Sequence, residues 1–340
     1  MSRFGRTRVA AALVGVLALV LAACSSTGGR QAAEGGGGGG GGGAGGVDTP
    51  RITVAMITHQ APGDTFWDQV RSGAEANAAK NNVELNYAND PDSGNMANLV
   101  QNAIDQGVDG IAVTLAFPDA VGPAAQRAVE AGIPVVALNA GLEQWQDYGA
   151  LMYFGQDETI AGQSAGERLN EEGAQNVICV NQEQGHVALE ARCAGVAETF
   201  EGTIEQLYVQ GTDMPTVRST IAAKLQEDPS IDRVLTLGAP FALTAVQSVT
   251  DAGSEAEVVT FDLNPELMQA IQSGDVPWAI DQQPFVQGYL SVDSLWLYVN
   301  EGRTIGGGEP VLTGPAFVDE TNIDSVMEAS GGGASEAASE

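Results

Sequence analysis

The sequence predicts an α/β protein made of two similar lobes, each with a parallel β-sheet covered by helices on both faces. Between residues 51 and 328, short β-rich runs alternate with helix-length segments, which is the pattern of doubly wound α/β architecture. Runs such as Val177-Ile178-Cys179-Val180 are apolar throughout, as strands buried on both faces require. The alternation forms two series of at least four strands, and the boundary between them is expected near Gly155 and Gln156.

The individual elements follow from this alternation in chain order. The first series predicts strands at 52–58, 83–88, 110–115 and 134–138, and helices at 66–79, 96–106, 120–131 and 158–172. The second series predicts strands at 177–181, 204–209, 233–238 and 258–262, and helices at 188–200, 215–226, 241–252 and 265–273. Ligands of open α/β sheets bind beyond the carboxyl ends of the strands. We therefore expect functional residues just after strands, in a cleft between the lobes.

The first 23 residues have the features of a secretory signal peptide. Arg3, Arg6 and Arg8 precede an uncharged run over residues 9–22 that is too short to span a bilayer. The run ends in Leu21-Ala22-Ala23-Cys24, which resembles a bacterial lipobox. This resemblance implies cleavage before Cys24 and lipidation of that residue, so that the protein is anchored to the outer face of the cell membrane. An ordinary signal peptide that happens to contain a Cys is the alternative.

Two further segments are expected to lie outside the fold. Residues 24–50 combine the lipidated Cys with a Gly-rich tether, because Gly-rich sequence buries little apolar area and stays flexible. Residues 329–340 are only Gly, Ala, Ser and Glu, and they predict a disordered tail.

The charge balance excludes several classes of partner. The chain has 44 Asp and Glu against 14 Lys and Arg, a net charge of −30, and loss of three Arg with the signal peptide takes this to −33. Nucleic acids and anionic membrane surfaces need clustered positive charge, so we expect neither as a partner. Contact with the membrane is expected through the lipid anchor only.

The segments that follow the expected strands carry amides, carboxylates, aromatic rings and one Arg. Phe66 and Trp67 begin a helix, and neighbouring side chains on a helix cannot both face inward. Trp67 belongs to the apolar stripe of that helix, which leaves Phe66, beside a cap from Asp64 or Thr65, free to face the cleft; burial of both rings in the core is the alternative. The other candidate site residues are Asn139, Glu190, Arg192, Asp262 and Gln282.

These residue types predict the chemistry of the ligand. Amide side chains donate and accept hydrogen bonds at once, as a hydroxyl does, and flat rings pack on the apolar face of a sugar. The strand ends contain no nucleophile–base pair. The sequence therefore predicts a binding site for a polyhydroxylated neutral ligand, with no enzymatic activity.

Several short motifs, taken together, resemble the periplasmic sugar-binding proteins, the ribose- and galactose-type solute receptors of ABC importers. In chain order they are Phe66-Trp67…Gly73-Ala74, Gly132-Ile133-Pro134-Val135-Val136, Tyr153-Phe154-Gly155-Gln156-Asp157…Ala161-Gly162, Phe261-Asp262…Ala270-Ile271…Gly274 and Asp281-Gln282-Gln283-Pro284…Gln287-Gly288-Tyr289. Each motif alone is weak, and their order and spacing over residues 51–328 carry the resemblance.

The resemblance implies a type I periplasmic binding protein fold, with two Rossmann-like lobes joined by three hinge crossings. Residues 51–154 and 283–311 would form the N-terminal lobe, and residues 155–282 and 312–328 the C-terminal lobe. The implied function is capture of a neutral sugar or related polyol outside the cytoplasm, and its delivery to an ABC permease by a monomer without a cofactor. A ligand-sensing module for a membrane receptor kinase is the alternative.

The resemblance also assigns ligand contacts, and it leaves the identity of the sugar open. The aromatic pair, the Asp after a second-lobe strand and the hinge Gln fall on Phe66, Trp67, Asp262 and Gln282. Asn139-Ala140 stands where many ribose-type relatives have Asp-Arg, and Gly238-Ala239 where relatives often have Asn-Asp. The Arg of the second lobe falls on Arg192, or a shift of one turn places Glu190 there instead.

Two Cys remain once Cys24 is lipidated. Cys179 lies in a strand and Cys193 on the following helix, in an oxidising compartment, so we expect a disulfide worth about 3 kcal/mol in the chain-entropy model. Two separate buried thiols are the alternative.

Two other patterns predict no chemistry. His59 and His186 are too few and too poorly accompanied for a metal site, and they either line the cleft or lie in solvated loops. Gly162-Gln163-Ser164-Ala165-Gly166 matches a hydrolase motif, but that mechanism needs the Ser on a turn between strand and helix, whereas Ser164 is expected in mid-helix.

Overall fold

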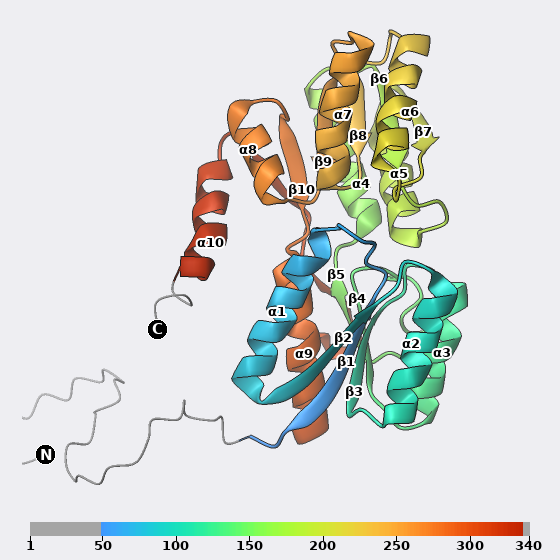
Figure 1. Ribbon diagram of the computed structural model, residues 1–340, viewed down its shortest axis with the longest axis vertical. Coiled ribbons are helices and arrows are strands. Elements are labelled where there is room, and N and C mark those ends of the chain that lie inside the picture. Colours follow the sequence, from blue (N-terminus) through green and yellow to red (C-terminus); the bar gives the residue numbers. More distant parts are fainter. Residues whose placement is uncertain (1–48, 336–340) are drawn as a thin grey trace, which may run out of the picture. The chain divides into compact units, whose positions relative to one another are not determined.

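The computed structural model describes residues 49–335 and contains two six-stranded sheets, one in each lobe (Figure 1). The signal peptide, the lipobox with Cys24 and all but the end of the Gly-rich tether lie outside the described residues. Strand for strand, the two sheets have the same order, so the lobes repeat one architecture.

The N-terminal lobe is built on the sheet β11-β5-β4-β3-β1-β2, in which all the strands are parallel. Its strands are β1 (Ile52–Thr58), β2 (Val83–Asn89), β3 (Gly110–Thr114), β4 (Val135–Leu138), β5 (Met152–Gly155) and β11 (Val311–Leu312). Helices α1 (Phe66–Asn81) and α9 (Pro284–Glu301) cover one face, and α2 (Ser93–Gln106) and α3 (Pro118–Glu130) the other. Apolar side chains therefore fill both faces of this sheet, as its apolar strands require.

The C-terminal lobe is built on the sheet β12-β10-β9-β8-β6-β7. Its strands are β6 (Asn176–Asn181), β7 (Thr203–Tyr208), β8 (Arg233–Thr236), β9 (Glu257–Phe261), β10 (Trp278–Asp281) and β12 (Ala316–Asp319). Its helices are α4 (Glu158–Glu171), α5 (Val187–Thr199), α6 (Met214–Glu227), α7 (Ala239–Ala252), α8 (Pro265–Ser273) and α10 (Ile323–Ser335). Strand β12 runs antiparallel to β10, and the other strand pairs described in this sheet are parallel. The chain reaches β12 directly from β11, which belongs to the other sheet.

The chain passes between the two sheets three times. It leaves the first sheet after β5, returns after β10, and crosses again between β11 and β12, which is followed by α10. The described fold is therefore the two-lobed, type I architecture with three crossings. None of the described helices is long and apolar enough to cross a membrane.

Close helix packing in both lobes depends on glycine. A Cβ added at Gly288 of α9 would overlap the carbonyl oxygen of Val70 in α1, and one added at Gly73 would overlap that of Phe285. In the C-terminal lobe, Gly162 of α4 meets the backbone of α5 in the same way. These glycines let helix backbones approach more closely than any side chain permits.

The eight strands and eight helices predicted from periodicity are all present, with ends that differ by at most three residues. The prediction missed β5, β10, β11 and β12, which have two to four residues. It also missed α9 and α10. The beginning of the predicted tail is wrong, because α10 continues through residues 329–335. Once a helix is nucleated, each further residue adds a backbone hydrogen bond, even where the sequence is a weak helix former.

Candidate functional site

A cavity of about 660 Å³ lies between the lobes, at the carboxyl ends of strands from both sheets. Its wall contains seven of the eight residues predicted from the strand ends, namely Asp64, Phe66, Trp67, Asn139, Arg192, Asp262 and Gln282. The parallel strands of each sheet deliver these side chains to one edge, and the crossings bring the two edges together.

Three of these residues form a buried hydrogen-bonded chain that joins the lobes. Asn139 Nδ2 donates to Gln282 Oε1 over 3.1 Å, and Gln282 Nε2 donates to Asp262 Oδ1 over 2.7 Å. Gln287 Nε2 also donates to Gln282 Oε1 over 2.8 Å. Gln282 lies at the second crossing, so the hinge residue itself orients one polar side chain from each lobe.

Asn139 and Asp262 share an unusual backbone conformation. Each follows its strand directly, each has a φ of 65°, and each backbone N–H donates to a neighbouring strand over 2.8 Å. The left-handed region disfavours residues with a Cβ, and Asn and Asp tolerate it better than most. Such conformations cluster at binding sites, where they aim a side chain into a cleft.

Arg192 is held in place by a buried ion pair. Its Nε and Nη2 donate to the two oxygens of Glu158 over 2.6 and 3.0 Å, and Nη1 donates to the carbonyl oxygen of Leu237 over 3.2 Å. The same Nη1 lies 3.5 Å from Asp262 Oδ2. Burial favours the neutral form of Arg192, but Glu158 and Asp262 outweigh it and raise the pKa of the guanidinium. Arg192 is therefore a fixed cation at the floor of the cavity.

Burial raises the pKa of Asp262 to about 7, while Arg192 and Gln282 act in the opposite direction. The carboxyl group thus titrates near neutrality and can accept a hydrogen bond from a ligand or, when protonated, donate one.

The start of α1 supplies the aromatic wall of the cavity. Trp67 is buried and Phe66 half-buried, and their rings meet edge to face with centroids 5.1 Å apart. Trp67 lies on the buried stripe of α1, as predicted, and both Phe66 and Trp67 line the cavity. Asp64 Oδ1 accepts the Phe66 N–H over 3.1 Å, and burial raises the pKa of Asp64 to about 6.

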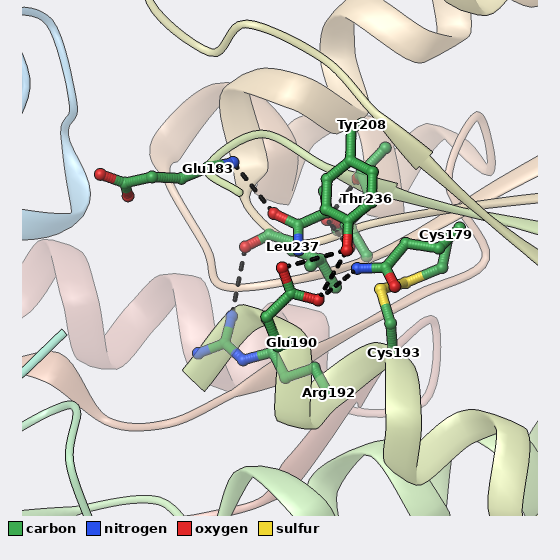
Figure 2. Close-up of a disulfide and its surroundings, with 11 residues drawn as sticks. Cys179, Glu183, Glu190, Arg192, Cys193, Tyr208, Thr236 and Leu237 are labelled. Atoms are coloured by element: carbon green, nitrogen blue, oxygen red, sulfur yellow. Dashed lines mark hydrogen bonds between the residues drawn. A yellow bond between two sulfur atoms is a disulfide. The ribbon is translucent and has the colours of Figure 1, made fainter. Parts of the chain in front are cut away.

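Glu190 does not line the cavity. Its carboxylate accepts from Tyr208 Oη over 2.9 Å, from Gln206 Nε2 over 2.8 Å and from the Gly185 N–H over 3.1 Å. Figure 2 shows Glu190 directed to Tyr208, while Arg192, two residues further along α5, is directed to Leu237. Residues two apart on a helix lie about 200° apart, so only one of them can face the cleft. The structure selects Arg192.

A disulfide fastens the helix that carries Arg192. Cys179 of β6 and Cys193 of α5 are bonded, with Cα atoms 5.9 Å apart (Figure 2). Since the bond lies one residue from Arg192, it ties α5 to the sheet beneath the cavity. The two sulfur atoms are buried in the core of the C-terminal lobe.

His59 and His186 are not solvated loop residues. Both are buried cavity-lining residues, and their Nε2 atoms lie 2.9 Å apart across the two lobes. Together with Glu183 they form a group whose ligand atoms lie within 4.8 Å of one another. Sequence spacing missed this group because it joins the ends of β1 and β6, which are far apart in the chain.

The cavity wall also contains residues that the sequence argument did not select. Gln182 and Glu183 follow β6, and Phe241 lies in the first turn of α7. Burial and the nearby Asp64 raise the pKa of Glu183 to about 7. The rule that functional residues follow strands would have found Gln182 and Glu183, whereas Phe241 carries no such signal.

Ser164 lies within α4, and its Oγ donates to the carbonyl oxygen of Ile160 over 2.9 Å. The hydroxyl is thus bonded to its own helix, away from any turn between strand and helix. The Gly-rich pattern around it serves helix packing through Gly162.

Comparison with known proteins agrees with this architecture. A sequence model of the periplasmic binding protein domain matches residues 54–304. The chain therefore belongs to the periplasmic binding protein family, whose members are extracytoplasmic solute-binding proteins of transporters and not enzymes.

Two curated relatives show the range of the family. The chain is 29% identical over 258 residues to a xylose/arabinose-binding protein of Sulfolobus acidocaldarius; the match covers 70% of this chain and 63% of that protein, less than two thirds of its length. It is 27% identical over 309 residues to a xylitol-binding protein of Mycolicibacterium smegmatis, covering 83% of this chain and 80% of that protein.

Two solved structures share the fold. A carbohydrate transporter from Acidothermus cellulolyticus 11B, in complex with myo-inositol, is 60% identical, with a TM-score of 0.82 over 82% of this chain and 98% of that chain. A solute-binding protein from Burkholderia graminis is 23% identical, with a TM-score of 0.72 over 81% of this chain and 97% of that chain, and supports the fold alone.

Proposed function

We propose that this protein captures a neutral cyclic polyol of the myo-inositol class in the cleft between its lobes and delivers it to an ABC importer. The observation that carries the proposal is the 60% identity to a carbohydrate transporter in complex with myo-inositol, across 98% of that chain. The chemistry of the cavity supports the same class of ligand.

The polar residues suit a ring with a hydroxyl on every carbon. Asp262 and Arg192 offer an acceptor and a fixed donor side by side, and Asn139 adds an amide from the opposite lobe. Such groups bind vicinal hydroxyls, each of which donates and accepts at once. In the proposed complex, Phe66 and Trp67 contact the apolar ring face.

The electrostatics favour a neutral ligand over an anionic one. Arg192 is already neutralised by Glu158, while Asp64, Glu183 and Asp262 surround the cavity with carboxyl groups. A phosphate would meet these acids without a free cation, which costs desolvation energy. We therefore expect inositol phosphates to bind far more weakly than inositol.

We also propose that a lipid anchor retains the protein at the cell surface. The lipobox motif supports lipidation of Cys24 and anchoring to the outer face of the membrane, with the Gly-rich tether as spacer. The expected result is that Cys24→Ser releases the protein from the membrane fraction into the medium. Retention of this variant in the membrane would contradict the lipid anchor.

Calorimetric titration tests the ligand. We expect the protein to bind myo-inositol with clear saturation, xylitol and pentoses more weakly, and inositol phosphate far more weakly still. Ser164→Ala, on the exposed side of α4, serves as a matched control and should bind as the wild type does. Saturable binding of an amino acid, with no response to any polyol, would refute the ligand class. Loss of labelled myo-inositol uptake when the gene is deleted tests delivery.

A further inference from the structure

Two histidines from opposite lobes meet edge to face at the seam of the cleft. His59 follows β1 in the N-terminal lobe and His186 caps α5 in the C-terminal lobe, with ring centroids 4.7 Å apart and Nε2 atoms 2.9 Å apart. His59 Nδ1 lies 2.8 Å from Thr114 Oγ1, and His186 Nδ1 lies 3.2 Å from the backbone nitrogen of Ala188. Every ring nitrogen of the pair thus has a protein partner.

The backbone determines where the hydrogens lie. The Ala188 amide can only donate, so His186 Nδ1 must accept. The single hydrogen of neutral His186 is therefore on Nε2 and points to His59. His59 Nε2 accepts it, which places the hydrogen of neutral His59 on Nδ1, where it is donated to Thr114. One arrangement of hydrogens satisfies all four nitrogens, and it requires both rings to be neutral.

Other contacts between the lobes accompany the histidine pair. The Val187 N–H donates to the Ala116 carbonyl oxygen over 3.0 Å, and Ala116, Ala140 and Ala188 form a small buried apolar cluster. On the other side of the cleft, Gln69 Nε2 donates to the Leu263 carbonyl oxygen over 2.8 Å. The histidine pair differs from these contacts because only its bond depends on a protonation state in the physiological range.

We propose that the His59–His186 hydrogen bond is a positioning latch between the lobes, which holds the cleft closed over its ligand only while both imidazoles are neutral. A proton added to His59 Nε2 would face the hydrogen on His186 Nε2, so two donors would oppose each other and the bond would be lost. Closure, and with it retention of the ligand, then weakens as the surroundings become acidic.

The pKa shifts that burial causes in the two histidines agree with this direction of the pH effect. Burial lowers the pKa of His59 to about 3, and burial with the nearby His59 and Arg192 holds the pKa of His186 well below its ordinary value. When the lobes separate, the rings meet water and their pKa values return toward about 6.5. At the two histidines the closed form thus binds fewer protons, so their contribution to affinity is full above about pH 6.5 and falls as the pH drops through that range.

Other titratable groups line the same cavity and act in the opposite direction. Asp64 after β1, Glu183 after β6 and Asp262 after β9 have pKa values raised to about 6, 7 and 7, so the closed form takes up their protons more readily than the open form. The pH profile of the wild type alone therefore combines two opposing contributions, one from the acids and one from the histidines. The histidine contribution is the difference between the wild type and variants that keep all three acids.

The hydrogen arrangement also disfavours a metal ion between His59, Glu183 and His186. A metal on His186 Nε2 would move the ring hydrogen to Nδ1, where it would face the Ala188 N–H and break the helix cap. Metal-bound His normally donates from its other nitrogen to an acceptor, and a backbone amide is none.

The test compares the wild type with the double variant His59→Gln/His186→Asn. Asn is a good N-cap and keeps an acceptor for Ala188, and Gln keeps a polar group toward Thr114, while neither titrates. The double variant should bind myo-inositol about fivefold more weakly at pH 7.5, the effect of one neutral hydrogen bond. Between pH 7.5 and 5.5 the wild type should lose about a hundredfold more affinity than the variant, as expected when each of the two imidazoles takes up one proton in the open form.

The two profiles separate the latch from a merely structural role. Parallel pH profiles would overturn the proposal, since a structural loss shifts affinity equally at every pH. A gain in wild-type affinity on adding Zn²⁺ that His186→Asn abolishes would overturn it in favour of a metal site.

The latch proposal depends on the proposed function only because the first test measures affinity for myo-inositol. If myo-inositol does not bind at pH 7.5, the proposed ligand fails while the latch is still measured by small-angle scattering of the ligand-free protein. The radius of gyration of the wild type should then increase between pH 7.5 and 5.5 more than that of the double variant. An equal response of both proteins would refute the latch.

Discussion

The two lobes hold one site residue each in the same backbone conformation, but the side chains at these positions differ in their chemistry. β4 and β9 occupy equivalent places in their sheets, and the residues after them, Asn139 and Asp262, have the same φ of 65° and the same backbone bond to the next strand. The N-terminal lobe places a neutral amide there, and the C-terminal lobe a carboxylate. Strand order thus determines where a site residue stands, and residue type determines what it can bind.

The two lobes also differ in the structural features that they contribute to the site. The aromatic wall of Phe66 and Trp67 comes from the N-terminal lobe, whereas the buried Arg192–Glu158 pair and the disulfide come from the C-terminal lobe. One lobe offers flat apolar surface, and the other offers fixed charge on a helix bonded to its sheet. We infer that a ligand is oriented by the C-terminal lobe and covered by the N-terminal one.

The largest effect is expected from breaking the buried charge of the C-terminal lobe. Arg192→Met leaves Glu158 buried without its partner, so the free energy of unfolding should fall by about 3–5 kcal/mol, measured by urea denaturation. Arg192→Met/Glu158→Gln should recover most of this stability but not the affinity for myo-inositol. Arg218→Ala, which removes an exposed ion pair, is the control and should leave the denaturation midpoint unchanged. Full affinity of the double variant for myo-inositol would mean that Arg192 is not part of the binding site.

A smaller effect is expected from releasing α5. Cys179→Ala/Cys193→Ala should lower the free energy of unfolding by about 3 kcal/mol, because the unfolded chain gains freedom between the two positions. Oxidised and reduced wild type should differ by a similar amount in urea denaturation, and the variant should not respond to reductant. A variant as stable as the wild type would mean that the bond does not support this lobe.

The smallest effects are expected from the equivalent positions themselves. Asp262→Asn should weaken myo-inositol binding by about 2 kcal/mol, the value of a hydrogen bond to a charged group, whereas Asn139→Ala should cost about 1 kcal/mol for a neutral one. Calorimetry at pH 7.5 measures both. Glu190→Gln, whose side chain faces Tyr208, should bind as the wild type does. Equal losses at Asp262 and Asn139 would remove the asymmetry between the lobes.

Much of the fold and of the candidate site follows from local pattern. The boundaries of β1 and α8 agree with prediction to the residue, because period and capping residues act within a few positions. Asn139 and Asp262 were selected because the carboxyl ends of parallel strands meet at one edge, whereas Gln282 came from the family resemblance, since β10 was not predicted. Very short strands such as β11 were missed, since two residues carry no period.

The sequence by itself determined two α/β lobes and the strand ends that carry polar and aromatic residues, because these depend on periodicity and residue chemistry. It also predicted a neutral polyhydroxylated ligand. The tertiary structure decided the rest. It chose Arg192 over Glu190, paired Cys179 with Cys193, and brought His59 to His186 across the cleft. Each of these depends on the rotation of a helix or on contact between distant segments, and such geometry is fixed only when the whole core packs.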